Sequence, residues 1–387
     1  MNLVYLSPNF PPNYFQFCDR LAKTGGCVLG IGEAPSEELR PELGSALLDY
    51  YQVRSLENYD EVLRACGYFI HEHGRLDRVE SHNEHWLIHE GRLREDFNMI
   101  GPKIEETCKL KRKSLMKKVF SSVGVNSAPG EMFIDKNSTI AFIQKHGYPI
   151  IAKPDIGVGA WATYKIGDEH ELDEFLKTKP DVDFFIEKFV DGELYTFDGL
   201  TNQNGDIVYY TSHYSTTGVF ELVAYNVDLN FYSLREIPAD VVELGMKSIK
   251  AFCVKEKFFH LEFFRQKTDG ALYALEINCR PPGGFITDMM NFAADIDVYQ
   301  EWANILMFNK FQAAVDRKYH CAHIARRNGK SYKLSHEDVC SKYGDKIVMI
   351  SELSPIFSPV MGNLAYIVRS PSKEDVIKMI HEVQETI

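Results

Sequence analysis

The sequence has little positive charge and lacks long apolar runs. Among its 387 residues, 43 Lys and Arg stand against 55 Asp and Glu, which gives a formal net charge of −12. A chain this acidic lacks the basic surface that nucleic acids require, so we expect no nucleic-acid partner. It has no run of about 18 apolar residues, so we also expect no membrane span.

Cysteine pairs and a secretory leader are missing as well. The eight cysteines are scattered, and none forms a Cys-x-x-Cys pair. Reduced structural thiols in a cytoplasmic protein are the simplest interpretation of this pattern. The first ten residues have no basic segment and no long apolar core, and Leu3–Leu6 instead has the composition of a first buried strand. We therefore expect a cytoplasmic location.

The length and the order of elements predict several domains of α/β and α+β class. A chain of 387 residues is too long for one ordinary core, so we expect two or three domains. Strands alternate with helices over residues 1–108, which predicts an N-terminal domain with a parallel sheet. Its predicted strands are Leu3–Leu6, Cys27–Gly30 and Tyr68–Ile70, and its predicted helices are Phe15–Ala22 and Leu56–Arg64.

The remainder of the chain mixes hairpins with amphipathic helices. A basic helix is predicted over Lys109–Val123, and Ser138 is predicted to cap the next helix. Strands Glu193–Thr201 and Ile207–His213 are predicted to form a hairpin. A closing helix is predicted to begin at Ser372.

Two predicted strands, Lys257–Arg265 and Ala271–Asn278, carry the strongest chemical pattern. Their register decides whether Glu262 and Glu276 share one face of the hairpin. A three-residue loop, Thr268–Gly270, sets the two acids opposite each other, whereas a two-residue turn would place them on opposite faces. We favour the three-residue loop.

Two acids opposite each other predict a cation between them. Like charges at this spacing destabilise a sheet unless something neutralises them. The Glu262 and Glu276 carboxylates, with the carbonyl oxygen of Asn278, make an all-oxygen site that suits Mg²⁺, with Mn²⁺ as an alternative ion. The competing interpretation is a solvated hairpin face with two unrelated acids.

Three further segments favour binding of an anion or a nucleotide. Arg280 can bind a phosphoryl group through two hydrogen bonds, and the glycines that follow it let backbone amides approach an anion. Lys153 ends a buried strand before a loop that contains Gly157 and Gly159, although an ordinary turn with an exposed lysine fits equally well. The strand Phe184–Val190 could bind an adenine edge, but an ordinary edge strand is the better interpretation when it is taken alone.

These residues resemble the ATP-grasp superfamily, in the branch that includes biotin carboxylase, D-alanine–D-alanine ligase and carbamoyl phosphate synthase. The resemblance rests on their order along the chain, which is Lys113, Lys153 with its glycine loop, Glu187 to Glu193, Glu262, Glu276, Asn278 and Arg280. The string Glu-x-Asn-x-Arg-x-Pro-Gly-Gly over residues 276–284 is the most specific part of the match. The resemblance implies an ATP-grasp fold with a nucleotide-binding region over residues 109–310. It places a small lobe at about 125–192 and lets residues 311–387 complete the large lobe.

The resemblance also implies a role for each matching residue. Lys113 matches the first nucleotide lysine, but Arg112 stands where the superfamily usually has Asp, so Lys111 stays a competitor. Lys153 matches the second phosphate lysine, and Arg280 matches the residue that stabilises the transferring phosphoryl group. The implied adenine-binding residues are Glu187, Lys188 and Val190, the implied ribose acid is Glu193, and the implied magnesium ligands are Glu262, Glu276 and Asn278.

The implied activity is an ADP-forming ligation of a small-molecule carboxylate to an amine. ATP with Mg²⁺ would turn the carboxylate into an acyl phosphate, which the amine then attacks. The resemblance also suggests a homodimer. One alternative is a biotin carboxylase-like carboxylation, which would need a separate carrier because the chain has no Met-Lys-Met sequence. A nucleotide-binding regulatory protein without turnover is the other alternative.

Position alone suggests further substrate contacts. Tyr214–Asn226 is expected to line the acceptor pocket. Arg317, Arg326 and Arg327 are candidates for a substrate carboxylate, although solvated basic residues are the more common case. The candidate bases are His213, His260 and His323, each of which is more often structural.

Overall fold

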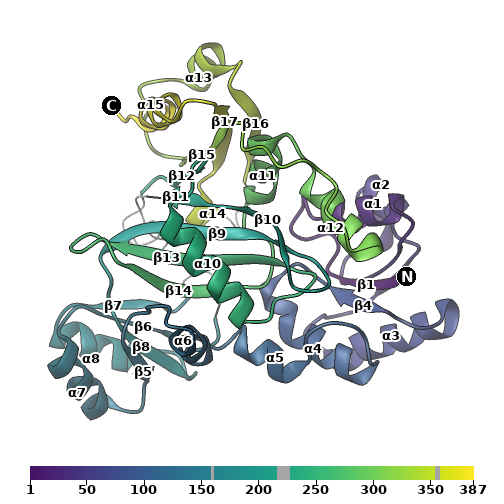
Figure 1. Cartoon of the computed structure of the whole chain (residues 1–387), viewed down its shortest axis with the longest axis horizontal. Helices are drawn as coiled ribbons and strands as arrows, with labels where there is room; N and C mark the ends of the chain where they lie inside the picture. Colours follow the sequence, from purple (N-terminus) through teal and green to yellow (C-terminus); the bar gives the residue numbers. More distant parts are fainter. Residues whose placement is uncertain (158–160, 216–226, 354–357) are drawn as a thin grey trace.

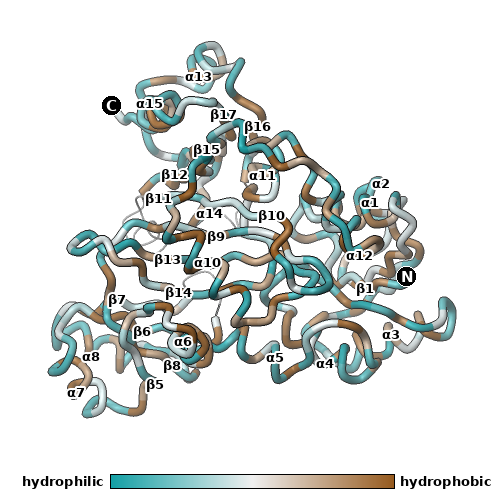
Figure 2. Tube along the Cα trace, viewed as in Figure 1, coloured by the Kyte–Doolittle hydropathy of each residue, from teal (hydrophilic) through white to brown (hydrophobic). Residues whose placement is uncertain are grey.

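The structure is a computed structural model that describes residues 1–157, 161–215, 227–353 and 358–387 (Figure 1). Gly159 and most of the segment Tyr214–Asn226 therefore lie outside the described residues. The described residues form three sheets, which follow one another along the chain. Along many helices the hydropathy of the trace alternates, as expected for helices that bury one side (Figure 2).

The N-terminal sheet is parallel, as predicted, with strand order β3-β2-β1-β4. Its central strands are short apolar runs, which suits a sheet with helices on both faces. The strands are β1 (Asn2–Leu6), β2 (Cys27–Gly32), β3 (Asp49–Gln52) and β4 (Arg78–Glu80). The helices are α1 (Phe15–Lys23), α2 (Pro41–Ala46), α3 (Tyr59–His73), α4 (Leu87–Asp96) and α5 (Ile104–Lys109), with 3-10 turns η1 (Ser36–Glu38) and η2 (Glu84–Trp86).

The predicted strand Tyr68–Ile70 is wrong, because these residues lie inside α3. Val62, Cys66 and Phe69 are fully buried at helical spacing, and they hold the helix against the sheet. Tyr68 and Ile70 lie on the outer side, with 40% and 37% of their surface exposed. An apolar run of three residues occurs both in strands and in helices with one buried side, so it does not predict either element.

The predicted helix Lys109–Val123 is found as α6 (Lys113–Ser122), but it begins four residues later than expected, at hydrogen bonds from elsewhere in the chain. α5 ends at Lys109, and α6 begins after a short break. The Asp155 carbonyl accepts a hydrogen bond from the Lys113 backbone N–H at 3.0 Å, and Asp155 Oδ1 accepts one from the Ser114 N–H at 2.8 Å. These bonds satisfy the first turn of α6 and fix Lys113 beside the loop that follows Lys153.

The small sheet is antiparallel, with strand order β5-β8-β6-β7. Its strands are β5 (Gly130–Met132), β6 (Ile150–Pro154), β7 (Tyr164–Ile166) and β8 (Phe184–Lys188). Helices α7 (Lys136–His146) and α8 (Glu169–Thr178) pack on the face that carries Ile150 and Ile186. Alternation along β6 and β8 leaves Lys153 and Glu187 on the other face. The cap of α7 is Asp135, which bonds the Ser138 N–H, so the predicted cap at Ser138 is wrong.

The large sheet has nine strands in the order β14-β13-β9-β11-β12-β15-β17-β16, with β10 beside β9. Its strands are β9 (Gly192–Thr201), β10 (Ile207–Thr211), β11 (His213–Ser215), β12 (Asn230–Ser233), β13 (Phe258–Gln266), β14 (Leu272–Asn278), β15 (His320–Arg326), β16 (Ile347–Glu352) and β17 (Leu364–Ser370). The predicted hairpin is confirmed by the pairing of β9 with β10. The strands of the C-terminal tail continue this same sheet.

Helices cover both faces of the large sheet. α10 (Ala239–Ala251) lies across β9 and β13 (Figure 1), where a Cβ on Gly245 would come within 2.4 Å of the Phe197 ring. This close approach requires glycine at position 245. The other helices are α11 (Ile286–Ala294), α12 (Val298–Phe308), α13 (His336–Tyr343), α14 (Ser358–Met361) and α15 (Lys373–Gln384). Ser372 caps α15, as predicted.

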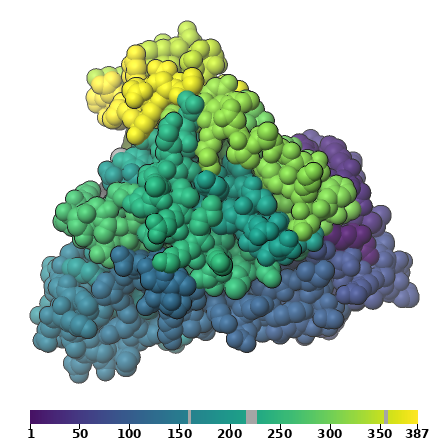
Figure 3. Space-filling model, viewed as in Figure 1, coloured from purple at the N-terminus to yellow at the C-terminus, as the bar shows by residue number. Residues whose placement is uncertain are grey.

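The N-terminal and large sheets are joined by a shared core and by buried ion pairs. α12 packs against α1, and side chains from both helices belong to one apolar cluster. Lys257, next to β13, reaches Glu80 of β4 at 2.5 Å, and Arg78 pairs with Glu256 at 2.7 Å. The space-filling view shows the parts of the chain in continuous contact (Figure 3). Over the described ranges, every helix is too short or too polar to cross a membrane.

Candidate functional site

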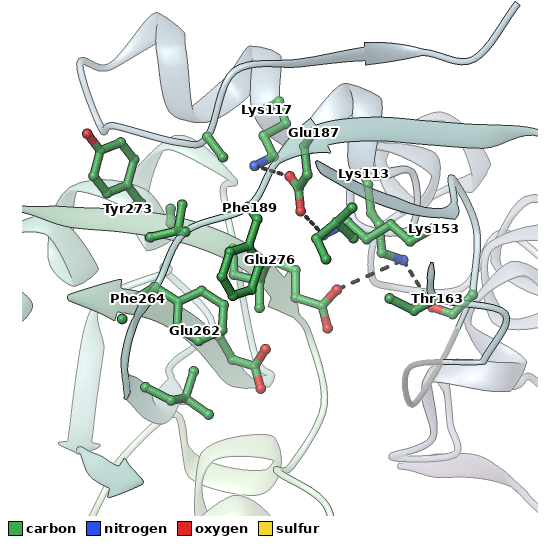
Figure 4. A pocket seen from close by; sticks show the side chains of 18 of the residues that line it. Lys113, Lys117, Lys153, Thr163, Glu187, Phe189, Glu262, Phe264, Tyr273 and Glu276 are labelled. Carbon is green, nitrogen blue, oxygen red and sulfur yellow. Dashed lines mark hydrogen bonds and ion pairs between the residues drawn. The ribbon is translucent and has the colours of Figure 1, made fainter. Parts of the chain in front are cut away.

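A cavity of about 620 Å³ lies between the small sheet and the edge of the large sheet. Its lining residues come from all parts of the molecule, including Glu84 of the N-terminal domain and two lysines of α6. Figure 4 shows Glu262 and Glu276 on one side of this space and the lysines 113, 117 and 153 on the other. Carboxylates and ammonium groups therefore face each other across it.

The predicted pairing of Glu262 with Glu276 is confirmed, although the predicted loop is wrong. Gln266, rather than Lys267, faces Ala271, so the loop has one residue more than expected. A regular strand would then place Leu275 opposite Glu262. A β-bulge between Glu262 and Phe263 of β13 and the facing residues of β14 absorbs the extra residue. Both acids consequently line the cavity.

The amide of Asn278 has two orientations that differ in their partners. In one, Nδ2 donates to Glu276 Oε1 at 3.3 Å. In the other, Nδ2 donates to Glu84 Oε2 at 2.7 Å, and the carbonyl oxygen turns toward Glu276. We assign the second, because its hydrogen bond is shorter and the first would leave the amide oxygen facing the acidic Glu84.

This arrangement fits a hard divalent cation. The carboxylates of Glu262 and Glu276 lie near the amide oxygen of Asn278. In the assigned orientation the Asn278 amide donates no hydrogen bond to Glu276, so these oxygens suit a shared cation. Within the described ranges, no cluster of three or more His, Cys, Asp and Glu side chains is placed to hold a metal. The two acids therefore suit an ion that takes further ligands from bound phosphate rather than a closed protein cage.

The structure separates the two candidate nucleotide lysines. Lys113 lines the cavity, where its Nζ lies 3.9 Å from Glu276 Oε2 and 3.3 Å from the Gly157 carbonyl oxygen. Lys111 is buried, and its Nζ bonds the Glu84 carbonyl at 2.9 Å. Lys113 is therefore the lysine that faces the candidate phosphate site, beside Gly157.

Lys153 and Glu187 meet inside the cavity together with Lys117, which the sequence analysis missed. Glu187 lies 2.6 Å from Lys153 Nζ and 2.7 Å from Lys117 Nζ. Burial alone would raise the pKa of Glu187, but the two lysines outweigh it and lower that pKa to about 2. Lys117 follows Lys113 by one helical turn, and that spacing on one helix face could have revealed it.

The residues after Glu187 divide between the two faces of their strands. Lys188 and Val190 line the cavity, and Lys188 Nζ also donates to the Tyr148 carbonyl at 2.9 Å. Leu194 of β9 lines the cavity too, whereas its neighbour Glu193 does not. Glu193 lies on the opposite face, where it hydrogen-bonds Tyr214.

Arg280 is held at the inner end of the cavity by a residue from the N-terminal domain. Its Nη1 donates to the Pro281 carbonyl at 2.8 Å, and its Nη2 donates to Glu84 Oε2 at 3.4 Å. Glu84 therefore contacts Arg280, Lys111 and, in the assigned orientation, Asn278. Glu84 was not predicted, and nothing in its local sequence indicates this role.

Two of the three candidate bases form a buried chain with an acid. Asp198 Oδ1 lies 2.5 Å from His260 Nδ1, and Asp198 Oδ2 lies 2.8 Å from His213 Nδ1. Burial disfavours charge on His260, but Asp198 outweighs it and raises the pKa of His260 to about 10. An imidazole that is held in its protonated form at neutral pH is a poor base, so His260 suits a structural or electrostatic role.

The third candidate, His323, is an apolar core residue. It is fully buried and stacks on Phe231 with 5.1 Å between ring centroids. Burial lowers its pKa to about 4. Arg326 and Arg327 are buried and bond backbone carbonyls, and Arg317 bonds the Tyr210 carbonyl. These arginines therefore stabilise the tail.

The burial of His323 predicts acid sensitivity. Because its folded-state pKa is below the usual 6.5, the unfolded chain takes up the proton first, and stability is lost as the pH falls from about 6.5 toward 4. The loss at pH 5 is on the order of 2 kcal/mol. Thermal unfolding at pH 8 and pH 5 should show a smaller decrease for His323→Gln than for the wild type. Equal decreases would contradict the assignment.

Two curated proteins match the sequence, and no family model does. The chain is 26% identical over 249 residues to an L-arginine-specific L-amino acid ligase of Bacillus subtilis, which covers 61% of this chain and 59% of that protein. It is 27% identical over 182 residues to a D-alanine–D-alanine ligase of Clostridium beijerinckii, with 44% and 57% covered. The matches thus span less than two thirds of either relative.

Solved structures match nearly the whole chain. An L-amino acid ligase from Bacillus licheniformis superposes with a TM-score of 0.76 at 17% identity, covering 99% of this chain and 96% of that one. The biotin carboxylase domain of a Hydrogenobacter thermophilus 2-oxoglutarate carboxylase, in complex with MgADP and bicarbonate, superposes with a TM-score of 0.68 at 16% identity, covering 100% and 90%. At these identities the likeness concerns the fold.

Proposed function

The chain has the ATP-grasp fold and resembles the carboxylate–amine ligases of that superfamily, and on this premise we propose that it is an ADP-forming ligase. In this proposal it activates a small-molecule carboxylate as an acyl phosphate and joins it to an amine. The names of both curated relatives, which are amino acid ligases, support amino acids as the substrate class.

One observation carries the proposal. Glu262 and Glu276 lie opposite each other in the same cavity as Lys113, Lys153 and Arg280. The acids and Asn278 suit Mg²⁺, with Mn²⁺ as an alternative, and the three cations suit phosphate oxygens. A site with both features suits transfer of a phosphoryl group better than it suits simple anion binding.

The cavity has an apolar end that suits a nucleotide base. Phe189, Phe264 and Tyr273 line it there (Figure 4), and Val190, in the link between β8 and β9, lines the cavity as well. Flat aromatic and aliphatic walls favour stacking and burial of a purine. Because Glu193 lies on the opposite face of β9, we no longer assign the ribose contact to it.

The charged residues then divide the transfer chemistry between them. Lys113 and Lys153 bind phosphate oxygens and offset their charge. Arg280 binds the phosphoryl group while it is transferred to the carboxylate. A bound Mg²⁺ would supply further charge neutralisation at the acids. Glu84 keeps the Arg280 guanidinium oriented through its 3.4 Å contact. The amine nitrogen attacks the acyl carbon, the bond from that carbon to the phosphate oxygen breaks, and inorganic phosphate leaves as the amine loses a proton, with no covalent link to the protein.

The remaining features of the proposal rest on the resemblance. We propose a division into residues 1–108, 109–310 and 311–387, a cytoplasmic location and a homodimer. The dimer is suggested by the neighbouring biotin carboxylase domain, whose structure is described as a dimer.

A matrix of carboxylates and amines tests the function. ATP-dependent ADP release is measured for each pair, and mass spectrometry identifies the product. We expect ADP release and an amide product for at least one pair of amino acids. ADP release that needs bicarbonate and biotin would favour the carboxylase instead. ADP binding without turnover across the matrix would favour the regulatory protein.

A further inference from the structure

We propose that His260 is a positioning residue that orients Glu262 so that one carboxylate oxygen is the preferred metal ligand, and that Asp198 and His213 hold His260 in place. The inference rests on the metal role proposed above for Glu262. It concerns His260, which lines the cavity beside Glu262, and the side chains that hold His260, rather than the proposed metal ligands themselves. Its consequence is a preference of the site for small six-coordinate cations.

The contacts run in one line away from the cavity. His260 Nε2 lies 3.2 Å from Glu262 Oε1, and His260 Nδ1 lies 2.5 Å from Asp198 Oδ1. Strand pairing explains the alignment, because His260 is opposite Asp198 where β13 runs beside β9. Residues opposite each other in a sheet share a face, so the backbone itself places these groups together.

Asp198 is held in place by three side-chain partners. It is fully buried, and it accepts hydrogen bonds from the Thr196 hydroxyl and from His213 Nδ1 as well as contacting His260. Thr196 Oγ1 in turn accepts the His213 backbone N–H at 2.9 Å. A buried carboxylate is costly unless it is paired in this way, and once paired it has no freedom to turn.

The fixed imidazole determines what Glu262 can offer a cation. Because His260 hydrogen-bonds Oε1 and takes one of its lone pairs, binding of a metal through both oxygens is disfavoured and Oε2 is the preferred ligand atom. Ca²⁺ accepts two-oxygen carboxylate binding and high coordination numbers, whereas Mg²⁺ requires near-octahedral geometry at shorter distances. A carboxylate restricted to one oxygen therefore favours Mg²⁺ or Mn²⁺ over Ca²⁺.

Direct metal binding tests the proposal. Mn²⁺ binding to the full-length protein with ADP is followed by electron paramagnetic resonance, and Mg²⁺ and Ca²⁺ are then titrated in as competitors. For His260→Ala we expect Mn²⁺ affinity to fall by about 10- to 100-fold, as for other lost partners of metal ligands. Ca²⁺ should also compete better relative to Mg²⁺. Asp198→Asn should change both in the same direction.

Two further variants separate positioning from general damage. His260→Gln keeps an N–H donor and should restore most of the affinity and the Mg²⁺ preference. His320→Ala removes another buried histidine of the large sheet, whose ring bonds the Ser233 carbonyl, and should leave the Mg²⁺-to-Ca²⁺ ratio unchanged. Circular dichroism confirms folding. A folded His260→Ala protein with wild-type affinity and ion preference would overturn the proposal.

The outcome is independent of ligase turnover. A wild-type protein that binds Mn²⁺ and ADP but joins no substrates would refute the proposed function, while the effect of His260→Ala on ion preference would still support the positioning role. If Glu262→Gln leaves Mn²⁺ affinity unchanged, the positioning role is refuted, because Glu262 would not be a ligand.

Discussion

Glu276→Gln is expected to lower kcat for ADP release by at least about 10³-fold, which corresponds to roughly 4 kcal/mol of lost transition-state stabilisation. Glutamine has almost the same shape but lacks the charge that holds a cation. The lost charge also faces Lys113 at 3.9 Å. Lys113 and Lys153 outweigh the effect of burial and lower the pKa of Glu276, so the carboxylate is ionised at neutral pH. Steady-state ADP release and thermal unfolding measure activity and fold separately.

Glu193→Gln is the matched control for this prediction. It makes the same chemical change at a residue of β9 whose side chain is on the face of the large sheet away from the cavity. We expect ADP release within a few-fold of the wild type. Normal activity in Glu276→Gln would discredit the metal assignment, and a loss limited to Glu193→Gln would return the ribose role to that residue.

Arg280→Lys is expected to lower kcat by about 10³-fold, with little change in the affinity for ADP. A lysine keeps the charge but cannot bind a phosphoryl group through two parallel hydrogen bonds. It also cannot keep both the contact to Glu84 and the bond to the Pro281 carbonyl. Single-turnover kinetics measure the transfer step, and isothermal titration measures ADP binding.

Arg235→Lys provides the comparison for Arg280. Arg235 donates to the carbonyls of Arg317 and Pro371, away from the cavity lining. Its replacement should leave both kcat and ADP affinity near their wild-type values. If Arg280→Lys weakens ADP binding as strongly as it slows turnover, then Arg280 binds the ground state and has no special part in the transfer.

The pairing of Glu262 with Glu276 could be predicted because the two strands that carry these acids follow each other in the sequence. Glu262 and Glu276 lie on adjacent strands, and alternation within each strand limits the options to two. The loop between them was predicted incorrectly, since its length depends on the bulge. The correct pairing therefore followed from the chemical argument that two acids and an amide belong together.

Residues that act through tertiary contacts could not be predicted. Glu84 reaches Arg280 across almost two hundred positions of sequence, and its neighbours show no pattern that points there. The start of the predicted helix Lys109–Val123 was misplaced for the same reason, because Asp155 binds the first turn of α6. Glu193 is a different case, because applying alternation to β9 would have placed it opposite Leu194.

The bulge in β14 separates the turn of the hairpin from the half that carries Glu262 and Glu276. β9 aligns Glu262 by placing it opposite Thr196, and the Asn126 carbonyl accepts the Ala274 N–H of β14 at 2.8 Å, so both strands have alignment contacts other than the turn beyond Gln266. Insertions or deletions in that turn can therefore accumulate without changing which oxygens face the cavity. The tip of this hairpin is thus a place where the chain can acquire new surface features while its chemistry stays constant.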